Sequence, residues 1–483
     1  MRLALAEGIV LFGGVVSTIV LWGRPALVNW VDLAVLLGQA GTLSVCCIVA
    51  FYYNDLYDLR IVRTLGAFIA RLLQAFGVAL ILLAGFYAVS PEIRIADGVF
   101  LSSMLVIVGL LLPIRAVGYA TMQRRVFAER VLIVGSGPLA RKLMAEIDAS
   151  PHAGYKIVAV ADDAAGPEAS RLPYPFRAPL AMLGKLAVEA RVDRIIVAMS
   201  ERRGRIPMAQ LLEAQARGIP VEDGLRTYQA LARKLAIETL PPSSLVFSDG
   251  FAPGPLNAAF RRLISLVVAG AGFLGTLPFM LVIALAIKLD SRGPVLFLHE
   301  RVGLHGKPFK LVKFRTMVPA DGATSEWVHD NQDRITRVGR WLRTFRLDEL
   351  PQFFNILRGD MNLVGPRPHP ASNFSLFSEK IPYYVLRTAV RPGVTGWAQV
   401  RYGYANNLEE EIEKMRYDLY YIEHLSLWFD VRILFDTVKI ILFGRGSYAT
   451  DAYPFPAPVD EAPPAEPRDI AHSALKPLAR GER

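Results

Sequence analysis

Residues Arg343 to Pro368 read RTFRLDELPQFFNILRGDMNLVGPRP, with two adjacent acids, Asp348 and Glu349, placed among arginines. Pro351 suits the first turn of a helix and FFNIL supplies its apolar residues, so the sequence predicts a helix directly after the acids. The start of a helix attracts anions, and two acids there are useful mainly if a metal ion or a reacting phosphate joins them. The segment therefore indicates phosphoryl chemistry.

The segment ends in the block GDMNLVGPRP (359–368), and three further blocks stand around it in a fixed order: KLDSRGPVLF (288–297), RVGLHGKPFKLVKFRTM (301–317) and RPGVTGWAQV (391–400). Together with RLDELPQFFNIL they resemble the catalytic core of bacterial sugar transferases, the monotopic phosphoglycosyl transferases that start exopolysaccharide chains. The resemblance runs from about Arg261 to Tyr448. It implies transfer of hexose-1-phosphate from a UDP-hexose to undecaprenyl phosphate, with release of UMP.

The resemblance also implies roles for the two acids. Asp348 would be the nucleophile, forming a covalent phosphosugar-aspartyl intermediate, and Glu349 would hold Mg²⁺ or deprotonate the lipid phosphate. A carboxylate attacks a charged phosphate only weakly unless a cation neutralises it, and Mg²⁺ needs just one or two protein carboxylates beside substrate phosphates. Asp348 and Glu349 are therefore the predicted catalytic residues and metal ligands, with Mg²⁺ as the cofactor.

Positive charge close to the acids would hold the phosphate groups. Arginines recur at every third residue before the acids, which on a helix gives a slowly rotating basic stripe: Arg334, Arg337, Arg340, Arg343 and Arg346. For the first three, a solvated or lipid-facing stripe competes with substrate contact. Arg343 and Arg346 are predicted to bind substrate because they are next to the acids.

Five more residues are predicted to bind substrate. Arg367 stands between two prolines that restrict its backbone, which suits presentation of a guanidinium to a phosphate or to uracil. Lys313 and Arg315 alternate with apolar residues, which places both cations on one face of a strand; an edge strand with solvated cations is the alternative. Arg391 and Gln399 lie in the RPGVTGWAQV block, whose glycine turns are expected to shape a nucleotide pocket.

The first 122 residues are strongly apolar and predict a four-helix transmembrane region, with spans near 8–22, 31–53, 67–89 and 96–120. Arginines flank the loop between spans two and three and also follow span four, while the other two loops carry little positive charge. The basic sides are therefore predicted to be cytoplasmic. This makes the chain a multi-pass protein of the bacterial inner membrane with cytosolic soluble domains.

A formal net charge of +10 and a pI near 9.5 admit nucleic acid, anionic lipid or phosphorylated substrates as partners. Apolar segments beside the basic ones favour the lipid bilayer. The sequence has no zinc-finger spacing or aromatic RNA-binding signature, so no nucleic acid is expected.

Residues 128–250 predict a Rossmann-like parallel-sheet domain. An apolar strand runs into Gly135 and Gly137, and a second strand ends in Asp162, at about the distance where a Rossmann fold places its ribose-binding acid. These three residues form the candidate nucleotide loop. The alternative is that the glycines serve only the tight turn, since Pro138 removes one backbone N–H that a phosphate would use.

The catalytic domain is predicted at 256–450, of α/β type, and begins with an apolar helix at 262–288. Taken alone, this helix reads as a fifth span that would carry the catalytic blocks away from cytosolic nucleotide sugars. The resemblance implies instead a re-entrant helix, broken at Pro278, that enters and leaves by one leaflet. The family often has serine directly before this proline, whereas this chain has Leu277, with Thr276 one residue earlier.

Residues 451–483 are rich in proline and poor in large apolar residues, which predicts a disordered tail. Asp418 is assigned to structure. Two other functions compete with the transferase: a membrane-tethered nucleotide-binding sensor acting through the Rossmann-like domain, and an ordinary glycosyltransferase that releases UDP. The run after the AQV block looks closer to exosortase-associated sugar transferases, which leaves the hexose open among glucose, galactose and relatives. A homodimer is an expectation for a large member of this type.

Overall fold

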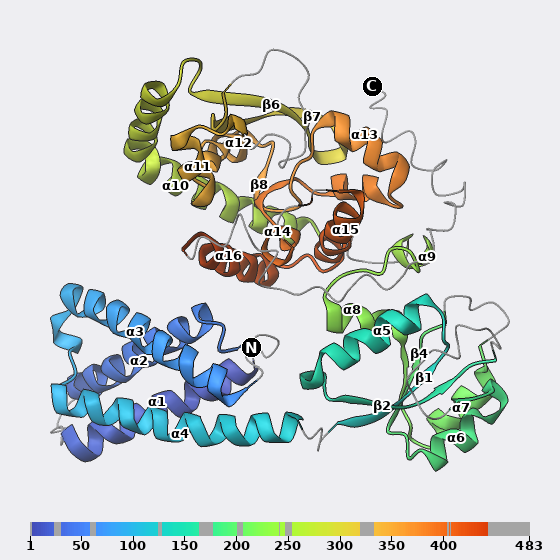
Figure 1. Cartoon of the computed structure of the whole chain (residues 1–483). Helices are drawn as coiled ribbons and strands as arrows, with labels where there is room; N and C mark the ends of the chain where they lie inside the picture. The colour runs from blue at the N-terminus through green and yellow to red at the C-terminus, as the bar shows by residue number, and fades with distance from the viewer. Residues whose placement is uncertain are drawn as a thin grey trace. The chain divides into compact units, whose positions relative to one another are not determined.

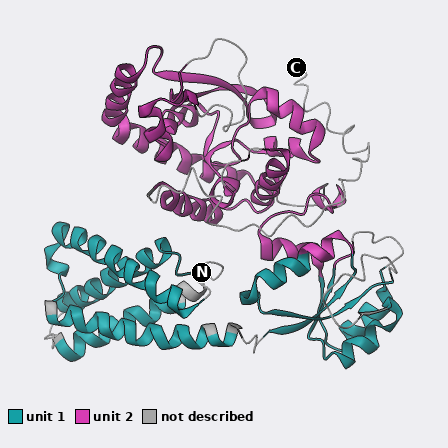
Figure 2. Ribbon diagram, in the orientation of Figure 1, with its two compact units in different colours: residues 1–136, 143–197, 202–222 teal, residues 137–142, 198–201, 223–483 magenta. Residues whose placement is uncertain are grey.

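The computed structural model describes residues 2–23, 30–57, 64–123, 128–163, 177–199, 206–240, 242–246, 254–318, 333–402, 405 and 407–442. The chain divides into two compact units, shown in Figure 2. The first comprises residues 1–136, 143–197 and 202–222, and the second comprises residues 137–142, 198–201 and 223–483. The predicted tail at 451–483 lies outside the described residues.

Four apolar helices open the first unit (Figure 1): α1 (Arg2–Gly23), α2 (Trp30–Tyr53), α3 (Leu65–Val89) and α4 (Asp97–Gln123). Helices α2 and α3, and residues Gly98–Gly118 of α4, are long and apolar enough to cross a bilayer; the apolar part of α1, Ala6–Trp22, is shorter. The four predicted apolar helices are therefore present; that all four cross the membrane stays a prediction.

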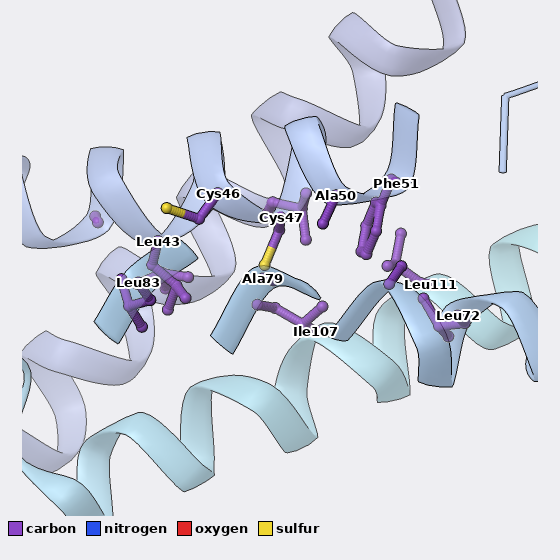
Figure 3. Close-up of a cluster of buried hydrophobic side chains, with 14 of the residues drawn as sticks. Leu43, Cys46, Cys47, Ala50, Phe51, Leu72, Ala79, Leu83, Ile107 and Leu111 are labelled. Carbon is purple, nitrogen blue, oxygen red and sulfur yellow. The ribbon is translucent and has the colours of Figure 1, made fainter. Parts of the chain in front are cut away.

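The four helices share one apolar core, part of which appears in Figure 3. Leu43 and Phe51 of α2 and Ile107 of α4 are almost completely buried in it. Cys47, on α2, points into the same core and is a free thiol. The adjacent cysteines at 46 and 47 therefore pack as small apolar side chains.

One buried ion pair joins the first and last helices of this bundle. Arg115 of α4 donates from Nε and Nη2 to the two carboxylate oxygens of Glu7 of α1, at 2.6 and 3.1 Å. The guanidinium also lies over the rings of Tyr57 and Phe68. Both charges are buried and hydrogen-bonded, which is the condition under which such a pair is tolerated in an apolar interior.

A parallel sheet completes the first unit, with strand order β3-β2-β1-β4-β5. Its strands are β1 (Glu129–Val134), β2 (Tyr155–Ala161), β3 (Arg177–Ala178), β4 (Arg194–Val197) and β5 (Val221–Asp223). The pairings β1–β2, β1–β4 and β2–β3 are parallel. The intervening helices are α5 (Pro138–Ala149), α6 (Leu183–Glu189) and α7 (Met208–Ala216), and α8 (Gly224–Ala232) follows β5. The predicted parallel sheet is confirmed.

The second unit carries the sequence blocks that prompted the resemblance. Its helices are α9 (Pro242–Val246), α10 (Pro255–Asp290), α11 (Arg337–Thr344), α12 (Gln352–Arg358), α13 (Ala371–Lys380), α14 (Trp397–Arg401), α15 (Leu408–Glu423) and α16 (Leu427–Leu442). Strands β6 (Leu296–Val302) and β7 (Pro308–Phe314) form an antiparallel hairpin. Strands β8 (Asn362–Val364) and β9 (Gly393–Thr395) pair in parallel.

Helix α10 is 36 residues long and continues through Pro278. Near its start, Arg261 pairs with Asp430 of α16 at 2.6 Å, and Arg262 donates to the backbone oxygens of Ile356 and Met361. Near its end, Ile283 and Ile287 pack in a small core with Phe314 of β7 and Leu342 of α11. Both ends of α10 are therefore fixed to the same unit.

The segment after α8, residues 233–240, is here called the strap. Leu235 and Ala236 are fully buried. The strap is held by backbone groups: the Leu235 N–H donates to Arg416 O at 3.0 Å, and the Trp397 indole donates to Arg233 O at 3.0 Å. The strap thus belongs to the core of the second unit.

Candidate active site

The acids lie on a short 3-10 turn, Leu347–Glu349, that connects α11 to α12. Arg346, directly before it, has φ of 54°, in the left-handed region that non-glycine residues seldom occupy. Pro351 follows with φ of −63°, and α12 begins at Gln352. The predicted helix after Pro351 is confirmed, and a strained backbone on the other side directs the acids inward.

Burial affects the two acids differently. Asp348 is 9% and Glu349 is 7% exposed. Burial raises the pKa of Asp348 to about 6, aided by the negative charge of Glu349 and opposed by Lys313, Arg367 and Arg343. Burial also disfavours the charged form of Glu349, but the guanidinium groups of Arg367 and Arg346 hold the pKa of that carboxyl below its usual range. Glu349 is thus a fixed anion, whereas the protonation of Asp348 changes closer to neutrality.

Three of the predicted arginines converge on the acids. Arg367 donates from Nη2 to Oε1 of Glu349 at 2.9 Å, and Nη1 of Arg346 lies 3.7 Å from the same oxygen. The positive charge of Arg343 favours the ionised form of Asp348. The turn and the GPRP segment, separate in sequence, are therefore brought together by charge.

Lys313 is the fourth cation at the acids. It lies on β7 opposite Phe297 of β6, and its ammonium is 5.3 Å from the centre of the Phe297 ring. Burial lowers the pKa of Lys313 to about 8, and the negative charge of Asp348 partly offsets this effect. A lysine in this setting is charged at neutral pH and close to its titration point.

The other three predicted substrate-binding residues are committed to backbone contacts. Arg315 donates to the Ser291 carbonyl at 2.8 Å and the Arg292 carbonyl at 2.9 Å, which fixes the chain after α10. Arg391 donates to the Gly359 carbonyl at 3.1 Å, at the end of α12. Gln399 donates to the Val394 carbonyl at 3.1 Å.

The basic stripe does not form one helical face. Helix α11 begins after Thr336, whose hydroxyl accepts from the Gly339 N–H at 2.9 Å, so Arg334 lies before the helix and donates to the Val318 carbonyl. The helix ends before Arg346, which is left-handed. Only the arginines at 337, 340 and 343 belong to α11.

The glycines of the RPGVTGWAQV block serve close backbone packing. A Cβ added to Gly396 would lie 2.2 Å from the Gly365 oxygen, and one added to Gly393 would lie 2.1 Å from the Gly365 nitrogen. Only glycine permits this approach, which fixes the GPRP segment against β9.

The candidate nucleotide loop in the first unit is braced by its own acid. Oδ2 of Asp162 accepts hydrogen bonds from the backbone N–H of Ser136, at 2.7 Å, and from the Ser136 hydroxyl. Gly135 has φ of 109° and donates to Ala161 O at 2.8 Å. These contacts favour the structural alternative, in which the loop and its acid hold the turn; the nucleotide-binding role remains a prediction.

Comparison with known proteins decides the family. Residues 256–444 match the family model described as bacterial sugar transferase. A Klebsiella pneumoniae protein named UDP-glucose:undecaprenyl-phosphate glucose-1-phosphate transferase is 32% identical over 374 residues, which cover 76% of this chain and 74% of that protein. The chain belongs to the bacterial sugar transferase family.

Two other relatives are similar to this sugar transferase over a smaller share of its length. An Aeromonas hydrophila protein, named UDP-N-acetylgalactosamine-undecaprenyl-phosphate N-acetylgalactosaminephosphotransferase, is 40% identical over 47% of this chain and 54% of its own length. An Escherichia coli K12 protein, named UDP-glucose:undecaprenyl-phosphate glucose-1-phosphate transferase, is 32% identical over 66% of this chain and 68% of its own length. Residues 53–212 also match a model described as CoA-binding domain. The predictions of the family and of a transferase enzyme are confirmed.

The acid pair of the sugar transferase suits a magnesium ion that also binds substrate. The guanidinium groups of Arg367 and Arg346 contact Glu349 at Oε1 and keep this carboxylate anionic. Within the described part of the chain, no group of three His, Cys, Asp or Glu side chains could form a metal cage by itself. Two carboxylates with substrate phosphates and water are an ordinary Mg²⁺ ligand set, so the residues fit.

Sequence reasoning missed the side chains that support Arg367 from behind, chiefly Arg387. A signal was present: Pro366, Pro368 and Pro370 cannot donate backbone hydrogen bonds, so other groups must hold this segment through its carbonyls.

Proposed function

We propose that this sugar transferase moves hexose-1-phosphate from a UDP-hexose to undecaprenyl phosphate and releases UMP, as the priming step of exopolysaccharide biosynthesis. The observation that carries the proposal is a buried acid pair of unequal pKa surrounded by four cations: Lys313, Arg343, Arg346 and Arg367. Such a site can hold several phosphate charges while keeping one carboxylate reactive. The names of the relatives favour these substrates, and their sugars differ, so the hexose stays open.

The proposed reaction has two displacements at one phosphorus atom. The Asp348 carboxylate attacks the sugar-bearing phosphorus of the UDP-hexose; a P–O bond forms to the carboxylate, and the bond to UMP breaks with its electron pair leaving on UMP. An oxygen of undecaprenyl phosphate then attacks the same phosphorus and returns Asp348 to its free form. A pKa of about 6 keeps Asp348 largely ionised at neutral pH while making it a stronger nucleophile than an ordinary aspartate.

The surrounding groups divide the remaining work. Arg367 and Arg346 keep Glu349 anionic, so that Asp348 and Glu349 together would hold Mg²⁺. When bound, this ion would neutralise phosphate charge as a Lewis acid. Lys313 and Arg343 lie on the Asp348 side, where they reduce repulsion between the carboxylate and the approaching phosphate.

A re-entrant α10 is part of the proposal. A straight helix of 36 residues is about 54 Å long, more than enough to cross a bilayer. However, Arg261 and Arg262 near its start contact residues that follow it in sequence, Asp430 and Met361. A spanning helix would put these partners on opposite sides of the membrane, so the contacts favour entry and exit through one leaflet.

The middle of α10 supplies the surface that would enter the lipid. Leu274, Leu281 and Val282 are each more than 60% exposed. Pro278 removes one helical hydrogen bond there, and the Thr276 hydroxyl donates to the Gly272 carbonyl at 2.6 Å, a contact that commonly bends helices. With α10 re-entrant, both soluble regions would face the cytosol of a bacterial inner-membrane protein.

The test is nucleotide release by the purified full chain with UDP-hexoses, undecaprenyl phosphate and Mg²⁺. We expect UMP, and we expect Asp348→Asn to abolish it without loss of folding, while Asp333→Asn, an exposed aspartate of the same unit, leaves it unchanged. Without lipid, the wild type should release one equivalent of UMP and gain the mass of one sugar phosphate at Asp348. UDP would identify an ordinary glycosyltransferase, and no release with any donor would favour the nucleotide-binding sensor.

A further inference from the structure

The segment that presents Arg367 to the acids is unusual in how it is held. Residues 365–370 read GPRPHP, and the prolines at 366, 368 and 370 have no backbone N–H. This segment therefore cannot form an ordinary strand pairing in which both donors and acceptors alternate. Its position depends on what donates to its carbonyl groups and on what its side chains contact.

Within the described residues, three of those carbonyls accept from backbone groups, that of Pro370 from the Phe374 N–H of α13 at 2.9 Å. The Pro366 oxygen accepts from the Gly393 N–H at 3.0 Å, and the His369 oxygen accepts from the Val302 N–H at 3.0 Å. Two neighbouring carbonyls accept from side chains instead. Nη2 of Arg387 donates to the Arg367 oxygen at 3.1 Å, and Nη1 of Arg301 donates to the Pro368 oxygen at 3.4 Å. The peptide that carries the Arg367 guanidinium is thus held by a second guanidinium.

Arg387 is itself fixed by buried partners. Its Nη2 lies 2.7 Å from Oδ2 of Asp418, and its Nη1 donates to the Tyr384 hydroxyl at 2.7 Å and lies 3.5 Å from Glu411. Arg387 is 7% exposed and Asp418 is 1% exposed. A buried arginine with this many partners has one accessible orientation, since any other would leave charge unpaired.

The same cluster holds the segment at a second point. The ring of His369 contacts the Tyr384 hydroxyl through Nδ1 at 3.0 Å and Glu411 through Nε2 at 3.3 Å. Burial lowers the pKa of His369 well below its ordinary value, with the charges of Arg387 and Lys414 adding to the effect. The imidazole is therefore neutral, and the charges of Glu411 and Asp418 are balanced by Arg387 and Lys414.

We propose that Arg387 is a positioning residue for transfer: by holding the Arg367 carbonyl against the cluster of Tyr384, Glu411 and Asp418, it keeps the Arg367 guanidinium on Glu349. The inference rests on the proposed function, because the readout is turnover. Displacements of about 1 Å in a catalytic group can cost on the order of 100-fold in rate. A variant that releases the Arg367 peptide should therefore lose turnover although no group that touches substrate has changed.

The decisive variant is Arg387→Gln in the full chain, and its matched control is Lys414→Gln. Both remove one positive charge from the same buried cluster. Lys414 pairs with Glu411 at 3.2 Å, whereas Arg387 also donates to the Arg367 carbonyl in the proline segment. We expect kcat to fall about 10- to 100-fold for Arg387→Gln, with KM for the UDP-hexose changed less than about threefold. We expect the kcat of Lys414→Gln to stay within about threefold of the wild type, even if its Tm falls as far as that of Arg387→Gln.

A variant that is partly unfolded would also show a low kcat. Each variant is therefore purified by size exclusion, and kcat is measured per folded molecule at a temperature well below its unfolding transition. Arg387→Lys adds a second test, and it decides the matter if Arg387→Gln does not fold. Lysine can keep the ion pair with Asp418 but lacks the fork that also reaches Tyr384 and the Arg367 carbonyl. We expect Tm to recover in Arg387→Lys while kcat stays low.

Three results would overturn the inference: equal losses of kcat in Arg387→Gln and Lys414→Gln, wild-type kcat in Arg387→Gln, or joint recovery of Tm and kcat in Arg387→Lys. Each would mean that the cluster stabilises the fold without positioning Arg367. A wild-type protein without UMP release is a different outcome, since it would refute the proposed function itself.

Discussion

Replacing Arg261 by methionine should destabilise the catalytic unit by about 3–5 kcal/mol, because the change removes one partner of a buried ion pair. Nε of Arg261 lies 2.6 Å from Oδ2 of Asp430, and the two side chains are 7% and 14% exposed. Without the guanidinium, the side chain of Asp430 would keep the Tyr421 hydroxyl, which donates to it at 2.8 Å, but no opposite charge from Arg261. Methionine fills similar volume, so the loss reports the charge and its hydrogen bonds rather than a cavity.

The assay is a double-mutant cycle with Asp430→Asn, read by intrinsic fluorescence during thermal unfolding of the full chain in nanodiscs. At about 2–4 °C per kcal/mol for a unit near 200 residues, Arg261→Met alone should lower Tm by roughly 6–20 °C. The double variant should recover part of this loss, giving a coupling energy of about 1–3 kcal/mol. Leu263→Met, an exposed position on the same helix, should leave Tm nearly unchanged.

Additivity of the two single changes within about 0.5 kcal/mol would refute this reasoning. It would mean that the start of α10 and helix α16 do not meet in the membrane-embedded protein. A re-entrant α10 would then lose its main support, and the interpretation as a fifth span would return.

Three further predictions concern other parts of the molecule. Gly396→Ala places a Cβ 2.2 Å from a facing backbone oxygen, so kcat/KM should fall at least about 10-fold, whereas Gly270→Ala, with open space around the added atom, should be neutral in the same UMP assay. Because the pKa of Lys313 is about 8, kcat/KM should fall as the pH rises through 8 and the ammonium loses its charge. Lys313→Arg should move this alkaline fall in kcat/KM to higher pH by at least one unit. If the fall stays at the same pH in the variant, Lys313 is not its source. Glu7→Gln should lower the stability of the helical bundle by about 3–5 kcal/mol because Arg115 stays buried without a counter-charge, and adding Arg115→Met should restore much of the Tm.

The parts that were predictable share a physical basis. Long apolar runs can be buried only in lipid or in one another, so the bundle and α10 are visible in the sequence. The acids at 348 and 349 and the arginine at 367 carry charges that need partners, and proline-restricted segments fix where those charges point. The contact of Arg367 with Glu349, which joins the two segments, was not itself predicted.

The parts that were missed depend on tertiary contacts. Strand alternation puts Lys313 and Arg315 on one face, but β7 ends at Phe314, and Arg315 turns toward the carbonyls after α10. The every-third arginine pattern assumes a continuous helix, whereas a left-handed Arg346 interrupts it. Neither effect has a local sequence signal, because a positive φ at arginine is imposed by the surrounding packing.

The strap determines where proteins of this family can be truncated or joined to one another in chimeras. The family match begins at residue 256, yet the fully buried Leu235 donates its N–H to the Arg416 carbonyl, and the Trp397 indole donates to the Arg233 carbonyl. A protein cut at the family boundary would lose both hydrogen bonds and leave a buried indole N–H without its acceptor. Chimeras between relatives should therefore be joined before the strap, near residue 223, where the longest continuous part of the second unit begins.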